Sequence, residues 1–199
     1  FQGQRVQVLC RPYRDGRLFH LAVNGSVLGL SAANGSAWLV KMVKRGETWY
    51  TVPVYKLGAG MVPTSLSAGH GVVVASASAV ESGKIWSTLL VEFGGNVSVV
   101  KLPLDIRDAK VLPEGYVALA YTNSSGSYVE VFGTARGYRA VKQLDMRPYF
   151  IKPLVGDRLL VGGSSSNGAA LLILRLEKPV KVFELLRDYY TVLTGALVV

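Results

Sequence analysis

Short segments that combine arginine, aspartate and tyrosine recur along the chain where one β-like run ends and the next begins. They read CRPYRDG, LDIRDA, LDMRPY and LLRDYY. Guanidinium and carboxylate groups pair with one another or bind a charged ligand, and tyrosine adds an aromatic surface. The residues that form this candidate binding site are Arg11, Tyr13, Asp105, Arg107, Asp108, Asp145, Arg147, Tyr149, Arg187, Asp188 and Tyr189.

Two interpretations of these segments stay open. Aligned by eye, the segments place an arginine at the same position in four repeats: Arg11, Arg107, Arg147 and Arg187. A repeated fold needs the same contact in each repeat, which favours Arg–Asp pairs that tie neighbouring units together. The alternative is a ring of arginines that binds an acidic ligand. The second unit, LGAGMVP, breaks the pattern and leaves a gap in such a ring.

Catalytic chemistry has little support in the sequence. Each of Asp105, Asp108, Asp145 and Asp188 has an arginine within two positions, which favours the ionised carboxylate and opposes the role of proton donor. No nucleophile elbow, phosphate-binding loop, zinc motif or calcium loop is found. We therefore expect a protein that is not an enzyme, with no catalytic residue, no cofactor and no metal.

Composition limits the class of protein. The chain has 199 residues, half of them apolar, but no apolar run approaches the roughly 18 residues of a membrane-spanning helix. Residues 1–3 (FQG) resemble the remnant of a protease site, so we assign one domain to residues 4–199. The single cysteine rules out an internal disulfide. The last residues, GALVV, stop in the middle of the pattern, which suggests that the natural protein continues.

The formal net charge of +9 favours an anionic partner. The basic residues are scattered rather than clustered, however, and no arginine-rich helix is visible, which argues against nucleic acid as the partner. Four Asn-x-Ser/Thr sequons, at Asn24, Asn34, Asn96 and Asn123, weakly favour an extracellular or surface location.

Internal repetition is the strongest signal in the sequence. Glycines of one recurring turn, Gly35, Gly83, Gly126 and Gly168, are 48, 43 and 42 residues apart. Each unit contains up to four β-like runs, and a spacing of roughly 40 to 50 residues is typical of four-stranded propeller blades. The fourth runs, such as VSVVKL, alternate apolar with polar residues as an outer strand does.

These repeats resemble those of β-propellers over nearly the whole chain, although no Trp-Asp, kelch or Asp-box signature is present. The resemblance implies an all-β domain with four complete four-stranded blades. VQVLC near the N-terminus and YYTVLTGALVV at the C-terminus would together supply a closing blade. A β-sandwich or barrel is the alternative fold.

The architecture favours a non-catalytic binding or scaffold domain that uses one propeller face for a protein or anionic partner. A surface glycan-binding (lectin-like) domain or a glycoside-hydrolase-like propeller is the alternative, since propeller glycosidases place two or three carboxylates at the channel mouth. The sequence indicates no oligomeric state.

Overall fold

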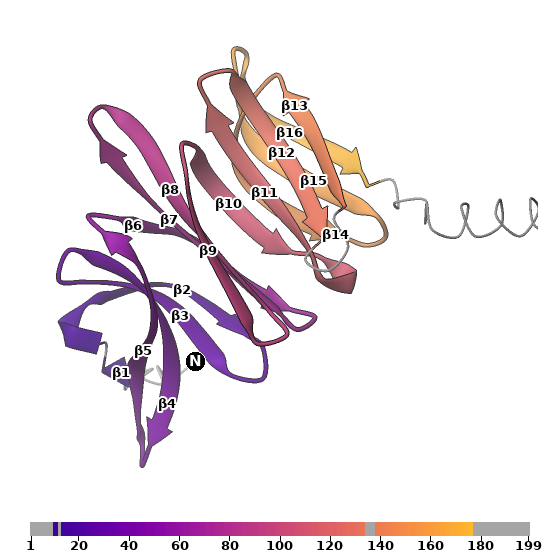
Figure 1. Cartoon of the computed structure of the whole chain (residues 1–199). Helices are drawn as coiled ribbons and strands as arrows, with labels where there is room; N and C mark the ends of the chain where they lie inside the picture. The colour runs from indigo at the N-terminus through magenta and orange to yellow at the C-terminus, as the bar shows by residue number, and fades with distance from the viewer. Residues whose placement is uncertain (1–9, 12, 134–137, 177–199) are drawn as a thin grey trace, which may run out of the picture.

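The protein is an all-β stack of four sheets (Figure 1). This computed structural model describes residues 10–11, 13–133 and 138–176. The only helical elements there are two three-residue 3-10 turns, η1 (Tyr13–Asp15) and η2 (Pro113–Gly115). No helix among the described residues is both long and apolar enough to span a membrane. The predicted all-β, propeller-like fold is confirmed.

Each sheet is an antiparallel meander in which consecutive strands pair. Sheet A consists of β2 (Arg17–Val23), β3 (Val27–Ala33), β4 (Ser36–Arg45) and β5 (Thr48–Ala59). Sheet B consists of β6 (Val62–Gly69), β7 (Val72–Glu81), β8 (Lys84–Phe93) and β9 (Asn96–Leu102). Sheet C consists of β10 (Asp105–Val111), β11 (Tyr116–Asn123), β12 (Gly126–Gly133) and β13 (Arg139–Leu144). Sheet D consists of β14 (Arg147–Leu154), β15 (Arg158–Ser165) and β16 (Gly168–Arg175).

The two ends of the repeat pattern fall mostly outside the described residues. The fourth strand predicted for sheet D and the C-terminal part of the predicted closing blade lie in residues 177–199, and most of the N-terminal part lies in residues 1–9. The short strand β1 (Cys10–Arg11) is described, and it pairs in parallel with Trp49 and Tyr50 of β5. Sheet A therefore has a fifth strand on its outer edge.

The first strand of every sheet lies on the inside of the stack. β2 contacts β6, β6 contacts β10, and β10 contacts β14, so the four inner strands follow one another from sheet to sheet. Two residues join each outer strand to the next inner strand: Gly60–Met61, Pro103–Leu104 and Asp145–Met146. We call the side of the molecule that carries these connectors the connector face.

Three apolar clusters lie between successive sheets. One joins sheets A and B, with Leu30, Leu39 and Val73 among its fully or nearly fully buried members. The next joins sheets B and C and includes Val74 and Leu119, and the third joins sheets C and D. Because neighbouring residues of β7 point to opposite faces, Val73 and Val74 belong to different clusters. The middle strands are therefore apolar on both faces, as the continuous runs of the sequence predict.

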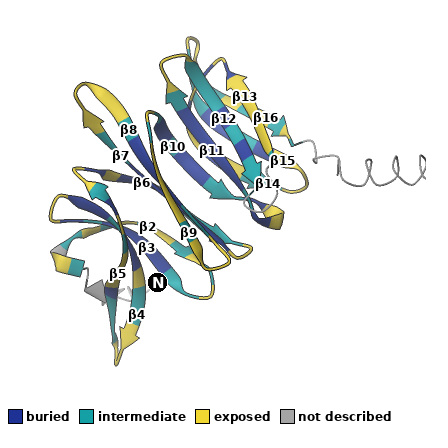
Figure 2. Ribbon diagram, viewed as in Figure 1, coloured by how far each residue is buried: buried dark blue, intermediate teal, exposed yellow. Residues whose placement is uncertain are grey.

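Burial is greatest on the second strands of sheets A, B and C, which are β3, β7 and β11. Figure 2 shows buried residues concentrated on strands such as β7, β10 and β11, whereas β9 and β13 are largely exposed. The alternating pattern of the predicted outer strands does not match a buried face, because Val99 and Val100 of β9 and Val141 of β13 are each 49% exposed.

Every inner strand contains an irregularity after its second residue. The pairing register with the second strand shifts at Phe19 in β2, Thr64 in β6, Arg107 in β10 and Tyr149 in β14. A β-bulge of this kind re-aims the side chains that follow it and increases the local twist. The recurrence of the bulge in all four sheets makes it part of the repeat.

The bulge in β14 depends on a glycine in the paired strand. A Cβ atom on Gly163 would lie 2.0 Å from the carbonyl oxygen of Arg147, whereas a Cβ on Gly69, in β6, would meet nothing closer than Val111 Cγ1 at 4.0 Å. We expect Gly163→Ala to lower the free energy of unfolding by about 1–3 kcal/mol, because backbone must move. Gly69→Ala, the matched control, should change it by less than about 1 kcal/mol in either direction. Urea unfolding of both variants measures the difference, and equal stabilities would contradict the assigned register.

Candidate binding site on the connector face

Asp108 joins three sheets from the middle of the inner strand β10. Its Oδ1 atom accepts a hydrogen bond from Ser65 Oγ of sheet B at 2.7 Å, and its Oδ2 atom accepts one from the backbone N–H of Ile151 in sheet D at 2.9 Å. Lys110 Nζ lies 2.7 Å from Oδ1 and balances the charge. The carboxylate is almost fully buried. Asp108 therefore acts as a structural tie between sheets.

The contacts of Asp108 and Ser65 satisfy backbone groups that sheet pairing leaves open. The inner edge of β10 has no neighbouring strand within its sheet, so its outward N–H groups need other acceptors. The N–H of Ala109 donates to Ser65 Oγ at 3.0 Å, and the N–H of Val111 donates to Ser67 Oγ at 3.0 Å. Side chains of one sheet thus cap the exposed inner edge of the next.

Asp105, Arg107 and Arg147 come together at the start of the inner strands. Arg107 Nη2 forms an ion pair with Asp105 Oδ2, and Arg147 Nη2 lies 3.8 Å from the same oxygen. Thr122 Oγ1 donates to that oxygen at 3.5 Å. The side chain of Asp105 is 10% exposed, that of Arg107 30% and that of Arg147 52%. The cluster therefore has a buried carboxylate beneath two cations, the outer of which is half exposed.

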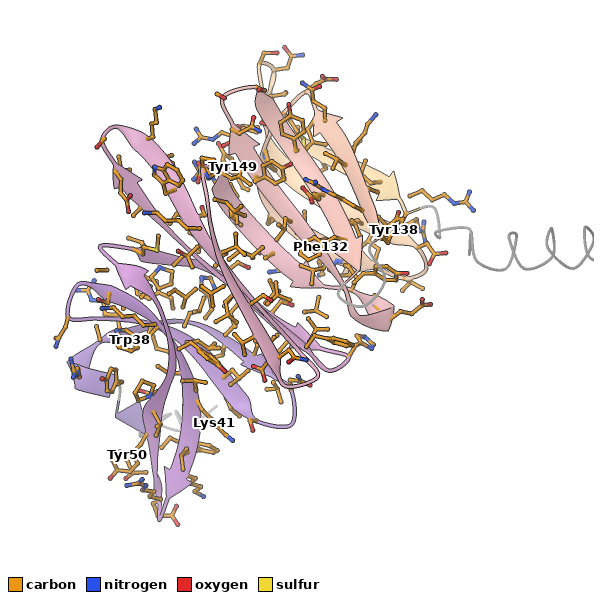
Figure 3. All side chains as sticks on the ribbon, in the orientation of Figure 1. Trp38, Lys41, Tyr50, Phe132, Tyr138 and Tyr149 are labelled. Atoms are coloured by element: carbon orange, nitrogen blue, oxygen red, sulfur yellow. The ribbon has the colours of Figure 1, made fainter. Side chains whose placement is uncertain are left out.

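The aromatic and acidic neighbours of this cluster make fewer contacts with the rest of the described chain. Tyr149 is exposed, and its hydroxyl lies 2.9 Å from Ser164 Oγ. In Figure 3, Tyr149 lies at the opposite end of the sheets from Phe132 and Tyr138. Asp145 is exposed, and no hydrogen bond or ion pair joins it to the rest of the described chain.

Tyr13 belongs to a different environment. Its ring packs edge-on against Trp38 of sheet A, with 5.5 Å between ring centroids, and its backbone N–H donates to Thr51 Oγ1. Figure 3 shows Trp38 on sheet A, away from Tyr149 on sheet D. Arg11 forms part of β1 beside β5. Arg187, Asp188 and Tyr189 lie outside the described residues.

Arg107 and Arg147 do not occupy equivalent positions in the repeat. β10 begins at Asp105 and β14 begins at Arg147, each directly after a two-residue connector. The bulges at Arg107 and Tyr149 confirm this correspondence. The alignment of LDIRDA with LDMRPY is therefore shifted by two residues: Arg147 corresponds to Asp105, and Tyr149 corresponds to Arg107.

Sequence reasoning missed Ser65, Ser67 and Lys110. It expected Arg–Asp pairs between neighbouring units, whereas the cation beside Asp108 is Lys110, and Arg107 pairs with Asp105 of its own strand. One signal was available: PTSLSAG places two serines at alternate positions of a strand expected to be buried. A buried hydroxyl needs a partner, so such serines indicate polar contacts between sheets.

His20 lies near the same polar centre. It is half-buried, and burial lowers the pKa of its imidazole below the usual value of 6.5. Lys110 lowers that pKa further, while Asp108 partly opposes the effect. His20 follows the bulge of β2 as Ser65 and Asp108 follow theirs.

The titratable groups around the site are poorly suited to proton transfer. Burial, and then the charge of Glu130, raise the pKa of Tyr121 to about 12, so its phenol stays protonated near neutral pH. Tyr121 Oη donates to Glu130 Oε2 at 3.2 Å, and Glu130 is also paired with Arg139. Within the described ranges, no group of three or more His, Cys, Asp or Glu side chains is placed to hold a metal ion.

Comparison of the sequence with protein-family models and with curated proteins finds no match. Solved structures do match. A protein from Lactobacillus plantarum superimposes with a TM-score of 0.51 at 10% identity, over 81% of this chain and 56% of its own. This chain thus spans little more than half the length of that neighbour. A likeness at this identity bears on the fold alone.

Two weaker neighbours have known ligands. One is MPT-4, a mannose phosphorylase from Leishmania mexicana in complex with phosphate, with a TM-score of 0.32 at 9% identity and 88% coverage of both chains. The other is YCF48 bound to a D1 peptide, with a TM-score of 0.35 at 12% identity, over 80% of this chain and 67% of that one. At these scores, neither neighbour says anything about the ligand of this chain.

The role of Asp108 can be tested by its removal. Asp108→Ala leaves the N–H of Ile151, Ser65 and Lys110 without their shared acceptor, so we expect the free energy of unfolding to fall by about 3 kcal/mol or more. Asp145→Ala removes an exposed carboxylate from a neighbouring connector and should change it by less than about 0.5 kcal/mol. Chemical denaturation measures the free energy of unfolding of the two variants. A similar loss of stability in both would contradict the role of Asp108 as a structural tie between sheets.

The lowered pKa of His20 predicts a pH dependence of stability. Because the unfolded chain takes up a proton at a higher pH than the folded chain does, stability should fall as the pH drops below about 6.5. His20→Gln removes this titration, so the variant should lose less stability than the wild type between about pH 7 and 5. Thermal unfolding over that pH range measures the difference. If the stability of both proteins changed equally with pH, the assignment of this titration to His20 would be contradicted.

Proposed function

We propose that this chain is a non-catalytic binding or scaffold domain that engages a protein or anionic partner through the connector face. The observation that supports the proposal most directly is the state of Arg147. Its guanidinium is half exposed, and among the residues that the structure describes it forms an ion pair with one carboxylate, Asp105, at 3.8 Å, which already forms a closer ion pair with Arg107. An arginine in this position has donors left over for a ligand.

The other charged groups of the face support a binding role over a catalytic one. Asp108 is buried and bound by two side chains and two backbone N–H groups. Asp105 is covered by two arginines and a threonine. A proton donor or nucleophile needs a carboxylate that reaches the substrate. Apart from the exposed carboxylate of Asp145, the accessible groups at the cluster are cationic and aromatic, which suits recognition of an anion beside an apolar or aromatic surface.

Binding of a fluorescent hexaglutamate peptide tests this proposal. We expect binding at low salt that weakens as salt is added, because the contact is exposed. Arg147→Ala should weaken the affinity roughly tenfold, since it removes charge-assisted hydrogen bonds, while the melting temperature changes little.

Arg158→Ala is the matched control. Arg158 is also exposed, but it follows the turn between β14 and β15, at the opposite end of the sheet, where its Nε donates to the carbonyl of Val155. This variant should bind the peptide as the wild type does. An equal loss of peptide affinity in the two variants would show that the peptide binds by nonspecific charge attraction. Turnover of chromogenic glycosides by the wild type would contradict the non-catalytic assignment.

A further inference from the structure

Sheets A and D form the two ends of the stack (Figure 1). The apolar clusters join sheet A to B, B to C and C to D, and within the described part of the chain none joins sheet D to A. Each contact between sheets uses the leading face of one sheet and the trailing face of the next. Sheet A is therefore left with a free trailing face, the A end face, and sheet D with a free leading face, the D end face.

The A end face exposes a residue that is buried in every other sheet. Two positions after the bulge of the inner strand, sheets B, C and D have Leu66, Ala109 and Ile151. These residues pack against the preceding sheet and are between 0% and 6% exposed. The corresponding residue of sheet A is Leu21, which is 58% exposed. A position that packs between blades thus has no blade covering it on sheet A.

The D end face shows the same feature on its third strand. The pairing registers place Leu171 of β16 at the position of Leu39 in sheet A, Leu89 in sheet B and Val129 in sheet C. Those three residues pack toward the following sheet and are between 0% and 7% exposed, whereas Leu171 is 73% exposed. Phe150, on the same rung of sheet D, is 43% exposed. Sheet D therefore presents the packing surface of a blade without a following blade.

The remaining residues of this sequence are too few to cover an end face as a complete blade does. Residues 177–199 are fewer than those of one four-stranded blade such as sheet B, which spans 62–102. Some of them are already assigned to the predicted fourth strand of sheet D. At the other end of the chain, β1 pairs with β5 and so belongs to sheet A.

We infer that the end faces dock on one another between two copies of this chain, so that the D end face of each copy covers the A end face of the other. The two faces are complementary because they are the two halves of the contact that already joins consecutive sheets. A contact between unlike faces closes into a ring or continues as a filament. Closed propellers typically have about 4 to 8 blades. Two copies with four sheets each complete such a ring, and three copies exceed that range.

Charge predicts how salt affects this assembly. Lys152, Arg158 and Arg175 are exposed and share the D end face with its apolar residues, and each copy carries a formal net charge of +9. Added salt screens the repulsion between two copies but does not screen the apolar contact, so the assembly should become tighter. Binding of an anionic peptide to the connector face should weaken under the same conditions, which separates the two interactions.

Sedimentation velocity of the full chain at high salt tests the inference. We expect a species with twice the mass of one chain, in a fraction that rises with protein concentration. Leu171→Asp and Leu21→Asp should each raise the dissociation constant at least about tenfold, because a carboxylate enters an apolar contact. Since both positions are exposed in the single chain, the melting temperature of the unassembled protein should change little.

Val80→Asp is the matched control. Val80 is 70% exposed, but it lies on β7 of sheet B, outside both end faces. This variant should assemble as the wild type does. A wild type that stays a single chain at every concentration would overturn the inference, as would an equal loss of assembly in Val80→Asp.

Mixing the two end-face variants tests which faces meet. A copy with Leu21→Asp keeps an intact D end face, and a copy with Leu171→Asp keeps an intact A end face. An equimolar mixture should therefore recover a two-chain species through one intact contact, more weakly than the wild type, which has two. Absence of recovery would contradict the pairing of unlike faces. Assembly of Leu21→Asp alone would also overturn it, because two D end faces would then be in contact.

Discussion

The inner edge of each blade sets the central constraint on this fold. An inner strand pairs with only one neighbour in its sheet, so half of its backbone N–H groups point away from any strand. In β10 and β14 these groups are capped by side chains of the preceding sheet: Ser65 and Ser67 bind the N–H groups of Ala109 and Val111, and Asp108 binds that of Ile151. The sheets are thus held at a spacing that apolar packing alone does not specify.

This constraint limits the chemistry that the connector face can perform. A buried carboxylate that accepts backbone N–H groups is fixed in place and cannot reach a substrate, which argues against proton transfer by Asp108. Arg147 lies at the outer side of the neighbouring cluster. The carboxylate nearest to it, that of Asp105, is already paired with Arg107, so the Arg147 guanidinium has hydrogen-bond donors left for a ligand. Structural ties and the proposed binding surface therefore lie within a few residues of each other, and the division between them follows burial.

The sequence predicts much of the fold and less of the site. Turn glycines such as Gly35 and Gly83, both with positive φ, mark hairpins that the structure contains, and the apolar runs match β7, β8 and β11. The β-bulges leave no such mark, because any residue can occupy them: Phe19, Thr64, Arg107 and Tyr149 have nothing in common. Because the bulges are not visible in the sequence, an alignment of the repeats relies on matching residue types. Such an alignment pairs Arg107 with Arg147, which is two residues out of register. Contacts between sheets, such as Ser65 with Asp108, join residues 43 positions apart and depend on that register.

Hydrogen exchange at individual backbone amides tests the capping of inner edges most directly. The N–H groups of Ala109, Val111 and Ile151 have no strand partner, yet each is bonded to a side chain of the preceding sheet. The structure predicts that they exchange as slowly as the amides of β10 and β14 that are paired within their own sheets. Exchange of all three at the rate of unprotected amides, while the paired amides stay protected, would contradict the account.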